Sequence, residues 1–196
     1  MTVPLIGLTG GMGAGKSTAL AALQRLGATV LSSDQIVHEL YETPQVRDAV
    51  VQRWGEQVAP GQVVDRGLIA GIVFGSEAER QWLEDLLWPL VGARVQGWLS
   101  EVQRLDPPPR AAVLEVPLLF EAGFERSCDA TVAIVADPQT ISARTRDRAH
   151  VAVAARNGRQ LSQEEKAELA TFVVVNEGTE QELQEKLSEV LAKLGR

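Results

Sequence analysis

Eight consecutive residues near the start of the chain constrain its fold more than any other feature. The run Gly10–Ser17 fits the pattern G-x-x-x-x-G-K-[ST] at every position. The apolar run Pro4–Leu8 precedes it, and a helix-like run begins at Lys16. Glycines in such a loop let backbone N–H groups turn inward around a phosphate, where side chains would block the approach. The segment is therefore interpreted as a strand, a phosphate-binding loop and a helix, with a merely tight turn as the alternative.

The residue types in this loop indicate a nucleoside triphosphate such as ATP, bound with Mg²⁺, as the ligand. The helix that follows offers unsatisfied N–H groups and the positive end of its dipole to the β-phosphate. Lys16 is predicted to span the β- and γ-phosphates, and the Ser17 hydroxyl to bind Mg²⁺. The predicted nucleotide-binding residues of the loop are Gly11, Gly13, Ala14, Gly15, Lys16, Ser17 and Thr18.

Short apolar runs recur along the chain and are separated by stretches with helical spacing. Because the runs hardly alternate, they fit strands that are buried on both faces of a parallel sheet. The pattern predicts a three-layer α/β fold of the P-loop NTPase type with a parallel sheet of roughly five strands. The predicted strands are Pro4–Leu8, Ala28–Leu31, Ala111–Val116, Ala130–Val135 and Phe172–Val175.

The regions between these strands differ in length, which suggests a division of one P-loop domain, 1–196, into parts. Residues 1–33, 105–137 and 171–196 are predicted to form the core. Residues 34–104 exceed what a crossover needs, so we expect a helical insertion that binds the acceptor. Residues 138–170 are expected to form a lid region.

Composition limits the partners of the chain. Its net charge of −7 argues against general affinity for nucleic acid. No apolar run reaches the ~18 residues of a membrane span, and no basic region precedes the short N-terminal apolar stretch. A single cysteine, Cys128, suits a reducing compartment. We expect a cytoplasmic protein without a membrane partner, and the sequence makes no prediction of oligomeric state.

Arginines are concentrated in the expected lid. Between Ile141 and Gln160 there are five arginines and one acid, Asp147; the arginines are Arg144, Arg146, Arg148, Arg156 and Arg159. The planar guanidinium suits phosphate recognition, whereas a solvated helix face normally carries both signs of charge. The pattern favours a lid over the ATP phosphates, with Arg144 as the transition-state contact and Arg148 next. The alternative is a solvated helix face.

A carboxylate follows the second predicted strand. Asp34 is placed just past the carboxyl end of that strand, the edge where open parallel sheets gather their ligands. There it could orient an acceptor hydroxyl and accept its proton. Alternatively, Asp34 is only the N-cap of a helix that begins at Gln35.

Several motifs narrow the class of P-loop protein. The chain contains neither Asn-Lys-x-Asp nor Asp-x-x-Gly, which argues against a GTPase, and its size fits a kinase of small metabolites. Beyond this, the chain resembles the dephospho-coenzyme A kinase family almost end to end. The segments that carry the resemblance are Gly7–Thr18, Ser33–His38, Asp65-Arg66, Leu68, Phe74, Trp82-Leu83, Leu86-Leu87, Val116–Glu121, Arg144, Arg148, Arg156 with Gln160, and Asn176 with Gly178.

The resemblance implies a specific reaction: ATP-dependent phosphorylation of the ribose 3′-hydroxyl of dephospho-coenzyme A, the last step of coenzyme A biosynthesis. It also implies Asp34 as the catalytic carboxylate, with Lys16 and Arg144, and Asn176 as a further nucleotide contact. The open alternatives are a P-loop kinase of a nucleoside, nucleotide or other small alcohol, and a catalytically weakened ATP-binding protein.

Three positions depart from the family pattern. Ser32 stands where the family usually has the first carboxylate of Asp-x-Asp, Trp88 where it has His before Pro, and Thr171 where it has Asp after Ala. These departures bear on the acceptor pocket more than on the ATP site. Outside them, Glu115 could order a magnesium-bound water or simply face solvent, and Asp65 and Arg66 could pair with each other or contact substrate.

Overall fold

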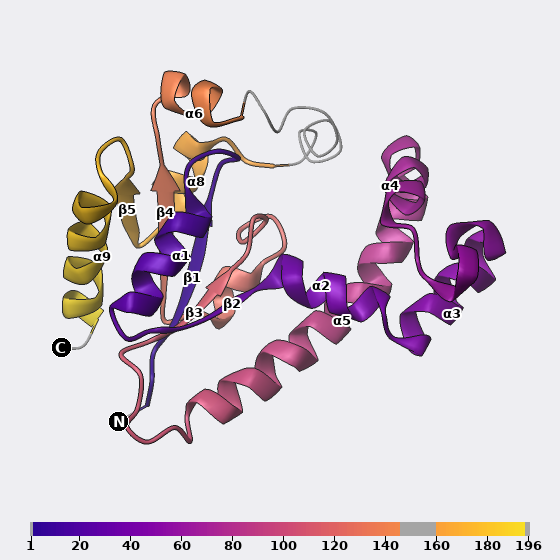
Figure 1. Ribbon diagram of the computed structural model, residues 1–196, viewed down its shortest axis with the longest axis horizontal. Coiled ribbons are helices and arrows are strands. Elements are labelled where there is room, and N and C mark those ends of the chain that lie inside the picture. Colours follow the sequence, from indigo (N-terminus) through magenta and orange to yellow (C-terminus); the bar gives the residue numbers. More distant parts are fainter. Residues whose placement is uncertain (1, 146–159, 195–196) are drawn as a thin grey trace. The chain divides into compact units, whose positions relative to one another are not determined.

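The computed structural model describes residues 2–145 and 160–194 of the chain. Its sheet has five parallel strands in the order β2-β3-β1-β4-β5 (Figure 1). The strands are β1 Leu5–Gly10, β2 Thr29–Ser32, β3 Ala112–Glu115, β4 Ala130–Val135 and β5 Phe172–Val175. The predicted parallel α/β fold is confirmed, and each observed strand overlaps a predicted apolar run.

Helices connect the strands and also form most of the long segment between β2 and β3. The α-helices are α1 Lys16–Arg25, α2 Ser33–Tyr41, α3 Pro44–Trp54, α4 Arg66–Gly75, α5 Glu77–Val102, α6 Pro138–Thr145, α8 Gln163–Leu169 and α9 Glu180–Leu194. Short 3₁₀ turns lie at η1 Glu56–Val58, η2 Pro60–Gln62 and η3 Phe124–Ser127.

The chain forms two compact units. The first comprises Met1–Ser32 with Leu99–Arg196, and the second comprises Ser33–Trp98. The second unit consists of helices and turns only, whereas the first contains the whole sheet. The acceptor-binding and lid roles assigned to 34–104 and 138–170 stay predictions.

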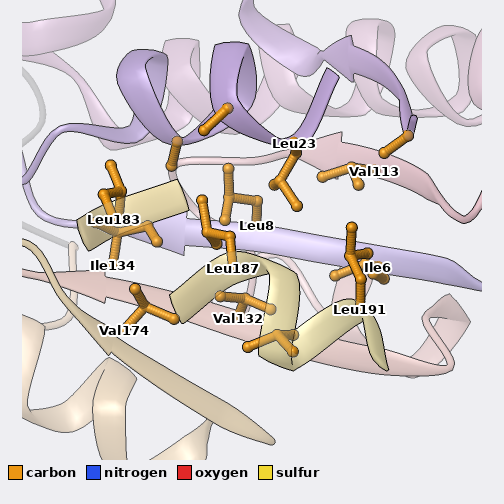
Figure 2. Packing of buried hydrophobic residues seen from close by; sticks show 14 of the residues in the cluster. Ile6, Leu8, Leu23, Val113, Val132, Ile134, Val174, Leu183, Leu187 and Leu191 are labelled. Atoms are coloured by element: carbon orange, nitrogen blue, oxygen red, sulfur yellow. The ribbon is translucent and has the colours of Figure 1, made fainter. Parts of the chain in front are cut away.

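Alternation along β1 explains how the first unit is layered. Ile6 and Leu8 point to one face of the sheet, where they join a buried cluster with Leu23 of α1 and Leu187 of α9 (Figure 2). Thr9 points to the opposite face, where its hydroxyl contacts Lys166 of α8. Helices therefore cover both faces, and α8 lies on the face opposite α1 and α9. This is why β1 is buried along its whole length.

The C-terminal helix packs as its spacing predicts. Leu183, Leu187, Val190 and Leu191 of α9 recur at intervals of three and four residues, and all four are buried. Each buried leucine contributes roughly 1.5–3 kcal/mol relative to its exposed state. The apolar stripe of α9 therefore closes the core on the side of α1.

The second unit is held together by an aromatic and ionic cluster that links α3 to α5. Glu79 accepts hydrogen bonds from Nε and Nη2 of the Arg53 guanidinium and from the indole nitrogen of Trp54, the last at 2.7 Å. The Trp54 and Trp82 rings meet edge to face with centroids 5.0 Å apart. Arg53 also lies 5.5 Å from the Trp82 centroid. These two partly buried tryptophans therefore pack against each other within the unit.

Asp65 is the N-cap of α4. Its Oδ1 accepts from the backbone N–H groups of Gly67 at 2.8 Å and Leu68 at 3.1 Å. We expect Asp65→Ala to lower the free energy of unfolding by about 1 kcal/mol, because two N–H groups lose their acceptor. In a thermal melt this corresponds to a fall of roughly 2–4 °C. Asp65→Ser is the matched control, since it keeps a capping oxygen, and a fall in acceptor affinity with an unchanged melt would contradict a purely capping role.

Among the helices that the structure describes, none has the length and apolar character that a membrane span requires.

Candidate active site

The phosphate-binding loop connects the end of β1 to the start of α1. Gly15 is the N-cap of α1 in the left-handed region, with φ 97° and ψ 28°. A side chain would be strained there, and glycine also offers no side-chain acceptor to the first N–H groups of α1. These N–H groups are therefore directed out of the helix end with its positive dipole, which suits an anionic ligand.

Gly10 fixes the other end of the loop by close packing. Its φ is +153°, and a Cβ built on it would stand 2.4 Å from the Ile134 carbonyl oxygen of β4. No side chain fits at that distance, so β1 and β4 approach closely where the loop begins. Glycine is therefore required at position 10 for two reasons: the predicted approach of a phosphate, and the close approach of the β4 backbone.

Lys16 lies over the loop. Its Nζ donates to the carbonyl oxygens of Gly10 at 3.0 Å and Gly11 at 3.2 Å. The ammonium thus stands near the loop backbone, and its bonds are to neutral carbonyls that a phosphate oxygen can replace with a stronger, charge-assisted bond. This geometry fits a triphosphate ligand.

Asn176 supports the loop from the end of β5. Its amide donates to the Ala14 carbonyl at 2.8 Å, and its backbone N–H donates to Val135 of β4 at 2.8 Å. The side chain is buried. The Asn176 side chain therefore supports the backbone of the loop at Ala14. Direct contact between Asn176 and a nucleotide stays a prediction.

Glu115 and Ser32 meet at the carboxyl ends of β3 and β2. They are register partners, and the Ser32 hydroxyl donates to Glu115 Oε2 at 2.6 Å. Glu115 is only 8% exposed, so the alternative that its carboxylate simply faces solvent is wrong. The hydroxyl at position 32 gives this buried carboxylate a donor, which a second carboxylate there could not do without a proton or a cation.

The remaining predicted catalytic residues lie on helix ends or outside the described residues. Asp34 is exposed in the first turn of α2, which begins at Ser33. The alternative of an N-cap for a helix that begins at Gln35 is therefore wrong. Arg144 belongs to the last turn of α6. Arg148 lies outside the described residues, as do Arg146, Arg156 and Arg159.

A pocket of about 510 Å³ borders the loop at Gly11. One wall comes from α6 and the other from the segment 160–164, where α8 begins. Lys166 of α8 and its partner Glu121 lie behind that second wall and were not predicted from the sequence. A lysine in a helix as polar as α8 is normally exposed to solvent, so its burial has no signal in the sequence. The only sequence signal was the segment Val116–Glu121, which contains Glu121.

A family model for dephospho-CoA kinase matches residues 4–182 of the chain. The chain belongs to the dephospho-CoA kinase family. A dephospho-CoA kinase of Lactobacillus johnsonii is 34% identical over 196 residues, which cover 97% of this chain and 98% of that protein. A second dephospho-CoA kinase, from Symbiobacterium thermophilum, is 36% identical over 181 residues, or 89% of this chain and 74% of that protein.

Solved structures agree with this membership at the level of the fold. The crystal structure of TT1252 from Thermus thermophilus is 32% identical and covers 99% of both chains with a TM-score of 0.82. A dephospho-CoA kinase from Campylobacter jejuni aligns with a TM-score of 0.69 over 97% of this chain and 96% of its own, at 21% identity. The latter supports the fold alone.

Two departures from the dephospho-CoA kinase pattern have local roles in the structure. Ser32 is the hydrogen-bond donor to Glu115 described above. Thr171 joins β4 to the start of β5: its hydroxyl accepts from the Thr131 N–H at 3.0 Å, and its own N–H donates to the Thr131 hydroxyl at 2.9 Å. The third departure, Trp88, lies within α5 and is 38% exposed.

Proposed function

We propose that the protein transfers the γ-phosphoryl group of ATP to the ribose 3′-hydroxyl of dephospho-coenzyme A, giving coenzyme A and ADP. The observation that carries this proposal is the family match over residues 4–182. The loop geometry supports it, because the N-terminus of α1 and the Lys16 ammonium suit a triphosphate. A location in the cytoplasm stays a prediction.

The proposed chemistry divides among few groups. The acceptor oxygen attacks the γ-phosphorus, the bond from that phosphorus to the β–γ bridging oxygen breaks, and the acceptor proton passes to Asp34. Lys16 and the loop N–H groups hold the β- and γ-phosphates and oppose the charge that develops on the bridging oxygen. Arg144 and Arg148 are proposed to contact the transferring phosphoryl. Asp34 suits its role because α2 follows β2 directly at the carboxyl edge of the sheet.

Mg²⁺ fits the donors available. Within 2–145 and 160–194, no three or more side chains of His, Cys, Asp and Glu form a metal-binding group. Mg²⁺ bound to ATP takes most of its ligands from phosphate oxygens and water, so one hydroxyl from the protein suffices. Ser17, the second residue of α1, is proposed to supply that hydroxyl. The ion, when bound, neutralises charge on the β- and γ-phosphates.

The acceptor is tested by comparing ADP release from the purified protein with different alcohols at saturating ATP and Mg²⁺. We expect kcat/KM for dephospho-coenzyme A to exceed that for adenosine, AMP or shikimate by at least about tenfold, because remote parts of the larger acceptor can be used in the transition state. Trp88→His is a useful companion variant, since it changes KM for the acceptor if Trp88 contacts it. Faster turnover with another acceptor would overturn the assigned substrate while leaving the kinase assignment in place.

A further inference from the structure

A lysine is completely buried on the face of the sheet that α8 covers. The exposed fraction of the Lys166 side chain is 0%, and its ammonium contacts three acceptors. These are Glu121 Oε1 at 3.0 Å, the Thr9 hydroxyl at 3.4 Å and the Pro117 carbonyl. Lysine is almost never fully buried unless it is paired. Here each of the three N–H donors has an acceptor, so the charge is accommodated.

The acceptors bring together segments that are far apart in the sequence. Glu121 Oε1 also accepts from the Leu161 N–H at 2.8 Å, and the Pro117 carbonyl also accepts from the Gln160 side chain at 3.4 Å and the Thr9 hydroxyl at 3.3 Å. The Lys166 cluster, which comprises Thr9, Pro117, Glu121 and Lys166, thus binds residues 160–161 to the loop after β3. Because Thr9 immediately precedes the phosphate-binding loop, the cluster also reaches the base of that loop.

The first turn of α8 lies directly against the phosphate-binding loop. Gln163 is held at the end of β4, where its side chain donates to the Ala136 carbonyl at 2.8 Å and accepts from the Ala136 N–H at 3.2 Å. A Cβ on Gly11 would stand 3.8 Å from the Gln163 Cβ. Lys166 lies three residues further along the same helix. The cluster therefore fixes the helix that forms one wall of the pocket beside Gly11.

The buried Lys166–Glu121 ion pair differs from apolar core packing in what it contributes to stability and to position. Desolvation lowers the pKa of Lys166, while the hydrogen bond and charge of Glu121 oppose that shift. A buried ion pair of this kind often stabilises a fold no more than apolar residues of similar volume do. Its hydrogen bonds, however, are directional, and they define one position for α8 where apolar contacts would tolerate several.

We propose that Lys166 and Glu121 are positioning residues for phosphoryl transfer, which hold α8 and residues 160–161 in register with the phosphate-binding loop. The proposal rests on the proposed function. Its effect falls on kcat, because ATP affinity comes mainly from the loop N–H groups and Lys16, which the pair does not contact. A displacement of about 1 Å beside a reacting group can cost as much as 10²-fold in rate. Residues 160–161 also directly follow the arginine-rich stretch in the sequence.

Three variants separate positioning from stability. Lys166→Met leaves the buried Glu121 carboxylate without its cation, and Glu121→Gln leaves the buried Lys166 ammonium without its anion, so we expect both to lower the melting temperature. The double variant leaves no unpaired charge and should recover most of that loss. Glutamine at position 121 can still accept from Leu161 N–H, so the double variant isolates the three Lys166 bonds. Lys186→Met is the matched control, because exposed Lys186 donates to a strand carbonyl, that of Val175, at 2.8 Å.

We expect the double variant to keep a kcat at least about tenfold below that of the native protein, with KM for ATP within about threefold. Lys186→Met should match the native protein in both constants. Turnover of dephospho-coenzyme A by the native protein tests the proposed function independently of the variants. The rate of ATP hydrolysis without an acceptor gives a second comparison between the native protein and the double variant. A double variant with a recovered melting temperature and native kcat overturns the proposal. A rise in KM for ATP as large as the fall in kcat overturns it as well.

Discussion

We expect Lys16→Ala to lower kcat for phosphoryl transfer by about 10²–10³-fold, equivalent to about 2.7–4 kcal/mol of transition-state stabilisation. The ammonium is the one side-chain cation that the loop itself supplies, and its present partners are the carbonyls of Gly10 and Gly11. Negative charge grows on the β–γ bridging oxygen as the phosphoryl group leaves, so a fixed cation is worth more in the transition state than in the bound ground state. Steady-state measurement of ADP release checks this result.

The fold should survive the change. Lys16 is half-buried, and its hydrogen bonds to the Gly10 and Gly11 carbonyls contribute on the order of 1 kcal/mol each to the free energy of unfolding. The melting temperature should therefore fall by only a few degrees. Lys193→Ala is the matched control, since Lys193 is exposed in the last turn of α9. Near-native turnover of Lys16→Ala would show that ATP is not bound by this loop in the way proposed.

The sheet and the phosphate-binding loop were predictable because their constraints are local. A strand buried on both faces, such as β3 with all four residues buried, cannot alternate with polar residues, so its run of apolar residues is visible in the sequence. The loop likewise depends on backbone geometry: Gly15 has a positive φ and Gly10 has no room for a Cβ. The glycines at these two positions therefore indicate the local backbone structure directly from the sequence.

The buried polar contacts could not be predicted, because each joins residues that are distant in the sequence. Lys166 and Glu121 are 45 positions apart, and nothing in the segment Gln163–Leu169 distinguishes its lysine from an exposed one. The start of α2 was missed for a different reason. Ser32, Ser33 and Asp34 are all residue types that favour the N-cap, so local preference does not choose among them.

The corrected start of α2 sharpens the case for Asp34. Inside the first turn, a carboxylate interacts with the helix dipole by roughly 0.3–1 kcal/mol, which is less than a cap that binds two N–H groups can provide. Asp34 is also exposed, whereas Ser33 directly before it and Ile36 two positions after it are buried. An exposed position in the first turn of α2 is compatible with the proposed role at the acceptor hydroxyl, which stays a prediction.

We expect Asp34→Asn to lower kcat by about 10²–10⁴-fold, the range for loss of a general base or of the group that orients the attacking hydroxyl. Asparagine has the same shape but cannot accept the proton that the acceptor releases. KM for ATP should stay close to the native value, because the loop and Lys16, not Asp34, are the groups proposed to hold the nucleotide. Quenched-flow measurement of a single turnover isolates the chemical step from product release.

Glu39→Gln provides the matched control for this change. Glu39 is an exposed acid on the same helix, and its Oε1 accepts from the Gln35 side chain at 3.1 Å, a bond that glutamine can still make. Both variants remove one negative charge from α2, so a general electrostatic effect would slow them equally, whereas a proton acceptor acts at one position only. Equal losses in Asp34→Asn and Glu39→Gln would therefore contradict the catalytic assignment. A lower melting temperature for Asp34→Asn with native turnover would return Asp34 to a structural role in the first turn of α2.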